Sequence, residues 1–154
     1  MASTDVFAKL QLRDAAAMIV LDAPASFELA LRGLQGVAVH RSLRAPTVSF
    51  ALAFVTTQAK VDQYARGLAA KAPGDAAIWF AYPKGSSKRY RCEFTRDTGW
   101  ATLGQLGFEP VRLIAVDEDW SALRFRRTEF IKTMKRAAQH ALSRSGKAKA
   151  GRKN

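Results

Sequence analysis

Cysteine and long apolar runs are what this sequence has least of. Cys92 is the single cysteine among 154 residues, so the chain cannot form an internal disulfide, which favours a reducing compartment. No apolar run approaches the roughly 20 residues that a membrane-spanning helix needs. The polar, mixed first residues do not resemble a signal peptide. We therefore expect a cytoplasmic protein without a transmembrane segment.

The glycine motifs that bind nucleotides are also missing. The GxxxxGK[ST] spacing of a P-loop is absent, and the turn LDAPASF has no glycine between Asp22 and Phe27. A Rossmann fingerprint would place glycines there, where the backbone approaches a cofactor. The second predicted strand ends in His40 and Arg41, not in the acidic residue that binds ribose hydroxyls. We therefore predict no cofactor held in the usual nucleotide manner.

Side chains for catalysis or metal binding do not gather into a recognisable pattern. The two histidines, His40 and His140, belong to no Ser/His/Asp order and to no metal-ligand spacing. Asp117, Glu118 and Asp119 are consecutive and therefore point in different directions, which is unsuited to one hard cation. We expect this acidic turn to pair with nearby cations, and we predict neither a metal nor a catalytic residue.

What the sequence does contain is a series of short apolar runs in the order of an α/β protein. Residues 16–22, 48–55 and 75–82 are nearly continuous apolar runs, which is typical of strands covered on both faces. Further strands are predicted at residues 37–41, 111–116 and 123–127, and helices at residues 4–12, 26–33, 56–71, 95–106 and 128–142. The fold class is predicted as α/β, a three-layer sandwich with an open, mostly parallel Rossmann-like sheet of about six strands, the last one antiparallel. Residues 1–127 are assigned to this domain.

A cationic loop follows the third apolar strand. Residues 84–96 hold five Lys or Arg and one acidic residue, a net charge of +4 out of +12. Hydroxyls, exposed backbone N–H groups and cations are the parts of an anion site. The candidate site residues are Tyr82, Lys84, Gly85, Ser86, Ser87, Lys88, Arg89 and Arg91; a solvated turn is the alternative.

Three further side chains of this loop are candidates for a role, namely Tyr90, Cys92 and Phe94. Tyr90 and Phe94 can stack on bases or anchor the loop to the domain. The neighbouring arginines are expected to lower the pKa of the Cys92 thiol.

The second basic feature is the carboxyl-terminal segment. Residues 122–154 carry 11 Lys or Arg and one acidic residue, a net charge of +10. Residues 128–154 are predicted to be an amphipathic basic helix followed by a disordered basic tail, and not a separate domain. Such an arm suits nucleic acid or another polyanion. A solubilising tail, a membrane surface and another acidic partner remain open.

Four segments, LDAPASF, FAYPKGSS, TRDTGW and VDEDWSALRF, together resemble a family of small, uncharacterised bacterial domains. That family looks like a shortened relative of the Rossmann-like methyltransferase fold, and the resemblance covers about residues 6–127. It implies a sheet whose last strand inserts antiparallel beside the preceding one. It implies no established activity and no catalytic residues.

Three functions follow from these observations. The first is a non-enzymatic domain that binds an anionic partner, such as nucleic acid, through the cationic loop and basic tail. The alternative is a small S-adenosylmethionine-dependent methyltransferase, with the cofactor over residues 22–27 and 82–87. The third is an assembly module that uses the carboxyl-terminal helix.

Overall fold

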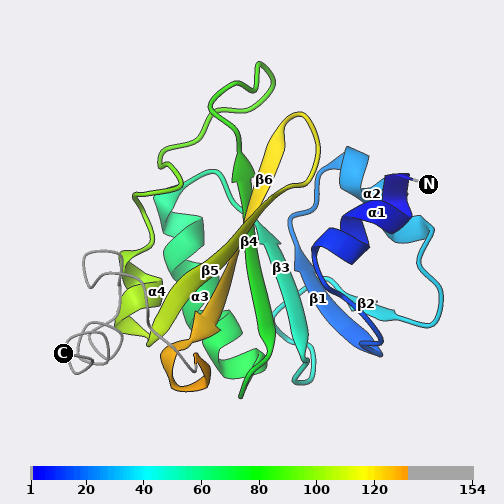
Figure 1. Cartoon of the computed structure of the whole chain (residues 1–154), viewed down its shortest axis with the longest axis horizontal. Coiled ribbons are helices and arrows are strands. Elements are labelled where there is room, and N and C mark those ends of the chain that lie inside the picture. Colours follow the sequence, from blue (N-terminus) through cyan, green and yellow to red (C-terminus); the bar gives the residue numbers. More distant parts are fainter. Residues whose placement is uncertain (1, 132–154) are drawn as a thin grey trace.

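The computed structural model describes residues 2–131, which form one six-stranded sheet with helices on both faces (Figure 1). The helices are α1 (Ala2–Lys9), α2 (Ala25–Arg32), α3 (Gln58–Lys71) and α4 (Ala101–Gln105), with a short 3-10 helix at Thr128–Phe130. The strands are β1 (Ala17–Leu21), β2 (Ala38–His40), β3 (Phe50–Phe54), β4 (Ala77–Pro83), β5 (Phe108–Ala115) and β6 (Trp120–Arg127).

The strand order is β2-β1-β3-β4-β6-β5. β1, β2, β3 and β4 are parallel, and β6 inserts antiparallel between β4 and β5. All five residues of β3 are buried, because this central strand is covered on both faces. The predicted fold class, a mostly parallel α/β sheet with an antiparallel last strand, is confirmed.

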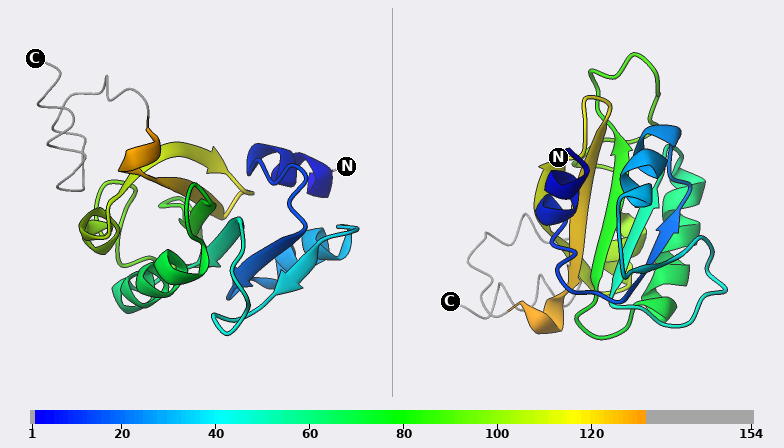
Figure 2. Two further views of the ribbon diagram at one scale, coloured as in Figure 1. Left: turned by 90° about the horizontal axis from the view of Figure 1, so that it is seen from below. Right: turned by 90° about the vertical axis from the view of Figure 1, so that its right-hand side faces the viewer.

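Two apolar clusters lie on opposite faces of this sheet. One joins Phe7 of α1 and Phe27 of α2 to Trp79 and Trp120, and the other joins Tyr64 of α3 to further strand residues. Figure 2 shows the sheet between these two layers of helices. Within residues 2–131, no helix is long and apolar enough to cross a membrane.

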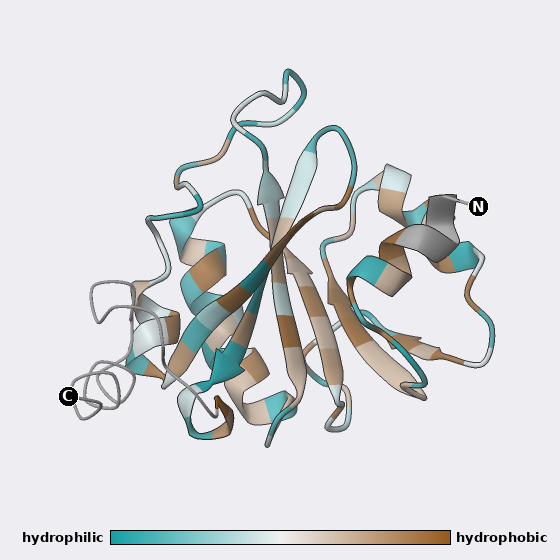
Figure 3. Cartoon of the chain, viewed as in Figure 1, coloured by the Kyte–Doolittle hydropathy of each residue, from teal (hydrophilic) through white to brown (hydrophobic). Residues whose placement is uncertain are grey.

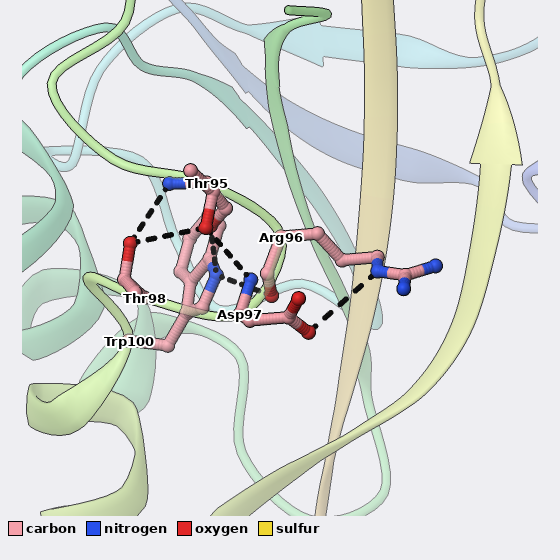
Figure 4. A network of polar contacts seen from close by, with 5 residues as sticks. All are labelled: Thr95, Arg96, Asp97, Thr98 and Trp100. Carbon is pink, nitrogen blue, oxygen red and sulfur yellow. Dashed lines mark hydrogen bonds and ion pairs between the residues drawn. The ribbon is translucent and has the colours of Figure 1, made fainter.

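The helix predicted from Thr95 begins later, at Ala101. Thr95 instead closes a turn with Thr98: the Thr95 N–H donates to Thr98 Oγ1 at 3.0 Å, and the Thr98 N–H donates to the Thr95 carbonyl at 3.3 Å. The Trp100 indole Nε1 donates to the carbonyls of Thr95 and Arg96 (Figure 4). The threonine hydroxyls therefore stabilise a turn, which competes with a helix start.

The predicted helix at residues 128–142 is described only at its beginning. Thr128–Phe130 forms a 3-10 helix, and Ile131 has extended backbone angles, so an α-helix does not begin at Thr128. The remainder of that helix, the tail and the assembly surface lie outside the described residues.

Candidate functional site

The strand order contains one reversal beside β1. β2 lies on one side of β1 and β3 lies on the other, so the direction in which strands are added to the sheet reverses at β1. Open α/β sheets bind ligands at such a switch point, beyond the carboxyl ends of the strands. In this chain the switch point is bordered by Asp22, which follows β1, and by Thr56 and Thr57, which follow β3.

A polar cluster of Asp22, Lys60 and Tyr64 lies at this point. The Tyr64 hydroxyl donates to Asp22 Oδ2 at 2.6 Å, and Lys60 Nζ donates to the Tyr64 hydroxyl oxygen at 3.2 Å. Lys60 Nζ also lies 3.9 Å from Asp22 Oδ2. The cluster thus combines a carboxylate, a phenol and an ammonium group.

Local structure fixes each member of the cluster. The Thr57 hydroxyl caps α3 by accepting from the Lys60 N–H, and the helix then presents Lys60 and Tyr64 on one face, one turn apart. Asp22 has φ 58, a left-handed conformation that is uncommon for a residue other than glycine. Such strain is concentrated at functional sites in proteins.

The environment raises the pKa of two of these groups, Tyr64 and Lys60. Burial raises the pKa of Tyr64, and its hydrogen bond to Asp22 raises it further. The hydrogen bond to Tyr64, followed by the charge of Asp22, raises the pKa of Lys60. At neutral pH the cluster therefore holds a neutral phenol beside a protonated lysine.

The cationic loop lies on the same edge of the sheet, and its predicted site residues separate into two groups. Tyr82 is buried, with its ring centroid 5.6 Å from that of Trp100. Ser87 Oγ donates to Asp119 Oδ1 at 2.9 Å, and the Lys84 N–H donates to the Asp119 carbonyl. Gly85, Ser86, Lys88, Arg89 and Arg91 are exposed. The exposed group contains three of the four predicted cations.

The second half of the loop is attached to the amino-terminal end of α3. The Glu93 carboxylate accepts from the Gln58 N–H at 2.8 Å, and the Glu93 N–H donates to the Thr56 carbonyl at 3.0 Å. Gln58 Nε2 donates to the Gly99 carbonyl at 2.8 Å. The loop is therefore held beside the switch point.

The remaining candidates have structural surroundings. Phe94 is buried against Trp100, whereas Tyr90 packs on Trp120, so both aromatic side chains anchor the loop. Burial raises the pKa of the Cys92 thiol, so the expected lowering by arginines is wrong. Among residues 2–131, no group of three or more His, Cys, Asp or Glu side chains is arranged to hold a metal ion. The Asp117 carboxylate instead accepts hydrogen bonds from the N–H groups of Asp119, which precedes β6, and of Trp120, which begins it.

The sequence points to Asp22, within the segment 22–27, but does not single out Lys60 and Tyr64. The ring of Tyr64 lies in the apolar cluster between α3 and the sheet. A usable signal was present: Lys60 and Tyr64 are four residues apart in the first turns after a threonine cap.

Comparison with known proteins gives matches of structure only. No family model matches the chain, and no curated protein does so. An S-adenosylmethionine-dependent methyltransferase from Aquifex aeolicus is similar with a TM-score of 0.57 and 14% identity, over 80% of this chain and 88% of that one. The N-methyltransferase NodS from Bradyrhizobium japonicum, in complex with S-adenosylhomocysteine, is similar with a TM-score of 0.51 and 10% identity, over 82% of this chain and 85% of NodS. TrmN from Thermus thermophilus is similar with a TM-score of 0.50 and 12% identity, and the match spans 81% of this chain but 48% of TrmN. At these identities the likeness establishes the fold, a Rossmann-like methyltransferase fold.

Two oppositely charged side chains lie at the switch point of this sheet. Asp22 and Lys60 have side chains that are 50% and 46% exposed. The left-handed turn that a glycine would make is made here by Asp22 itself. Arg41, which follows β2, is held by two hydrogen bonds from its guanidinium to Glu28.

Proposed function

We propose that this chain is a small S-adenosylmethionine-dependent methyltransferase-like protein that holds the amino-acid end of its cofactor between Asp22 and Lys60. The observation that carries this proposal is the charged pair beside Tyr64 at the switch point of a methyltransferase-like sheet. The structural neighbours support this alternative more than a non-enzymatic role.

Each residue of the cluster has a defined task in this proposal. The Asp22 carboxylate accepts hydrogen bonds from the ligand ammonium, and Lys60 pairs with the ligand carboxylate. Tyr64 orients Asp22 through its 2.6 Å hydrogen bond. The bound cofactor would supply a methyl group on a sulfonium centre. The protein residues bind and orient the ligand, and no proton transfer is assigned to them.

Isothermal titration calorimetry with S-adenosylmethionine and S-adenosylhomocysteine tests this proposal. We expect both ligands to bind, and Asp22→Asn and Lys60→Gln each to weaken binding by about tenfold, because each removes one charge-assisted hydrogen bond. Tyr64→Phe should weaken binding less, since it keeps both charges.

Two charge-matched variants serve as controls. Asp14→Asn and Lys71→Gln remove the same charges from residues outside the cluster, and they should bind as the wild type does. The absence of both binding heat and a thermal shift at millimolar ligand would contradict the proposal. Equal weakening in the control variants would show that net charge, not the cluster, is responsible.

A second function, binding of an anionic partner such as nucleic acid, is favoured by the exposed cations of the loop. The loop is fixed at one end by Ser87 and Asp119 and at the other by Glu93, so Lys88, Arg89 and Arg91 are presented on an anchored segment. The triple variant Lys88→Gln/Arg89→Gln/Arg91→Gln should lose affinity for a short oligothymidylate and retain that for S-adenosylmethionine. The reverse pattern would contradict the anion-binding role.

A further inference from the structure

Arg124 is a half-buried cation in the middle of β6, and not all hydrogen-bond donors of its guanidinium have an acceptor in the described part of the chain. Its Nη1 donates to Gln11 Oε1 at 2.8 Å, but its Nε is buried and has no acceptor within the described part of the chain. The register of the sheet pairs Arg124 with Trp79 of β4, whose buried Nε1 likewise has no acceptor there. Two neighbouring buried donors without acceptors are costly, because each loses its hydrogen bond to water.

Three further arginines lie around Arg124. Arg112 of β5 is its register partner on the other side, and Arg13 and Arg126 are close enough to act on its charge. Burial lowers the pKa of Arg124, and the like charges of these arginines lower it further, while Asp75 opposes them. Arg13 and Arg112 are exposed. Figure 3 shows the hydrophilic end of β6 at the edge of the sheet opposite the cationic loop.

The carboxylates whose side chains the structure describes neutralise this cluster only in part. Asp75 is engaged by Arg126 through two hydrogen bonds of 2.8 Å. Glu109 is buried opposite Arg126 and has its own interactions, and Asp14 is the exposed neighbour of Arg13 in the sequence. Residues 132–154 contain no Asp or Glu, so their side chains add no carboxylate.

The backbone beside the cluster is strained. Gln11 and Arg13 have φ of 59 and 56, and they account for two of the three positive-φ residues other than glycine in the described chain. The Gln11 side chain in this segment accepts from Arg124, and the charge of Arg13 acts on the same guanidinium. Such strain persists where the surrounding structure requires it, and it is common at binding sites.

We propose that Arg13, Arg112 and Arg124 form a binding site for a phosphate group on the α1-side face of β5 and β6. Guanidinium groups bind phosphate with paired, charge-assisted hydrogen bonds. Arg124 has one internal acceptor, Arg112 is its register partner, and the charge of Arg13 acts on it. Arg126 stays with Asp75 and adds charge. This site is separate from the Asp22 cluster, and it does not depend on the function proposed above.

The experiment is titration of the full chain with inorganic phosphate, followed by calorimetry and by the NMR signal of the Arg124 Nε–H. We expect saturable binding and a shift of that signal. Arg112→Gln and Arg13→Gln, both at exposed positions, should each weaken phosphate binding by about tenfold. Arg66→Gln removes the same charge from the exposed face of α3 and should leave binding unchanged.

A second arm distinguishes a free phosphate from the phosphates of a nucleic acid. If Arg112→Gln also weakens binding of an oligothymidylate, the site is used by a nucleic-acid backbone; if it weakens only phosphate, the site takes a small phosphorylated ligand. No binding of phosphate by the wild type would overturn the proposal. Equal weakening by Arg66→Gln would also overturn it, since binding would then follow net charge alone.

Discussion

Arg127, the last residue of β6, closes the carboxyl-terminal end of α3. Its guanidinium donates to the carbonyls of Ala69 at 2.8 Å, Ala72 at 2.9 Å and Gly74 at 2.6 Å. It also lies over the Phe108 ring, 4.7 Å from the centroid. The carbonyls at the end of a helix lack intrahelical partners and carry partial negative charge, so a cation there is stabilising. One side chain thus joins two strands to a helix.

Replacing this side chain should be costly. Arg127→Met keeps most of the apolar stem but leaves the three carbonyls without their donor, and we expect a loss of about 2 to 4 kcal/mol in the free energy of unfolding. Arg127→Lys keeps the charge without the planar fork and should recover less than half of that loss. Urea unfolding measures both. A loss below about 0.5 kcal/mol for Arg127→Met would contradict this role.

Tyr64 and Tyr82 make the free energy of unfolding depend on pH in the alkaline range. Burial raises the pKa of both hydroxyls above the ordinary value of 10.0. An acid whose pKa is raised by folding stabilises the protein fully below the unfolded pKa, and this contribution is lost as pH rises through the folded value. We therefore expect the free energy of unfolding to fall from about pH 10 upward.

The variant Tyr82→Phe tests this pH dependence, because it keeps the ring among Phe94 and Trp100 and removes the ionisable hydroxyl. Its unfolding free energy should fall less steeply above pH 10 than that of the wild type, as followed by urea unfolding at a series of pH values. A parallel fall in both proteins would exclude Tyr82 as a source of the effect.

Among the elements, the long connection at residues 84–100 depends on a close approach at Gly99. This glycine has φ 93, and a Cβ there would lie 2.6 Å from the Phe94 Cβ and 3.0 Å from Gln58 Oε1. Its carbonyl accepts from Gln58. The approach brings the connection onto the amino-terminal end of α3, next to the candidate site.

Gly99→Ala should therefore destabilise the protein by at least about 2 kcal/mol, from backbone strain and from the clash together. Gly85→Ala in the same connection is the matched control, because an added Cβ at that position meets nothing within 4 Å. Thermal unfolding compares the two variants. Equal midpoints would show that the connection can move away from α3 without cost.

The central strands could be predicted from sequence because their burial leaves a direct pattern. The run VSFALAFV is apolar on both faces, and β3 lies inside it with every residue buried. β5 was predicted to begin at Val111 but begins at Phe108, since Pro110 lies on an edge strand, where proline is tolerated. Edges are less constrained by burial, so their limits are harder to predict.

The candidate site could be predicted only in part. Asp22 and Tyr64 are 42 residues apart, and no local pattern links a turn aspartate to the face of a later helix. The three-dimensional arrangement follows from the parallel pairing of β1 with β3, which brings the end of one strand beside the helix that follows the other. Arg112 comes to lie opposite Arg124 in the same way, through the pairing of β5 with β6.

On the scale of the whole molecule, positive charge is divided between the loop and the end of the sequence. Residues 132–154 hold eight of the 25 Lys and Arg residues and no acidic residue, so the remainder of the chain carries +4. Residues 84–96 alone carry +4, and the rest of residues 1–131 is therefore neutral overall. The proposed binding of a polyanion would thus have two separable electrostatic sources.

Binding of an oligothymidylate at a series of salt concentrations separates these sources. We expect the fragment 1–131, checked for folding by circular dichroism, to bind more weakly than the full chain and still through Lys88, Arg89 and Arg91. Three phosphate contacts correspond to a slope of about −2 in the logarithm of affinity against the logarithm of salt concentration. The loop triple variant in this fragment should not bind, whereas Arg32→Gln/Arg66→Gln/Lys71→Gln, with the same charge change, should bind as before. If the fragment fails to bind while the full chain binds, the polyanion belongs to residues 132–154; affinity that is indifferent to salt would contradict an electrostatic contact at either place.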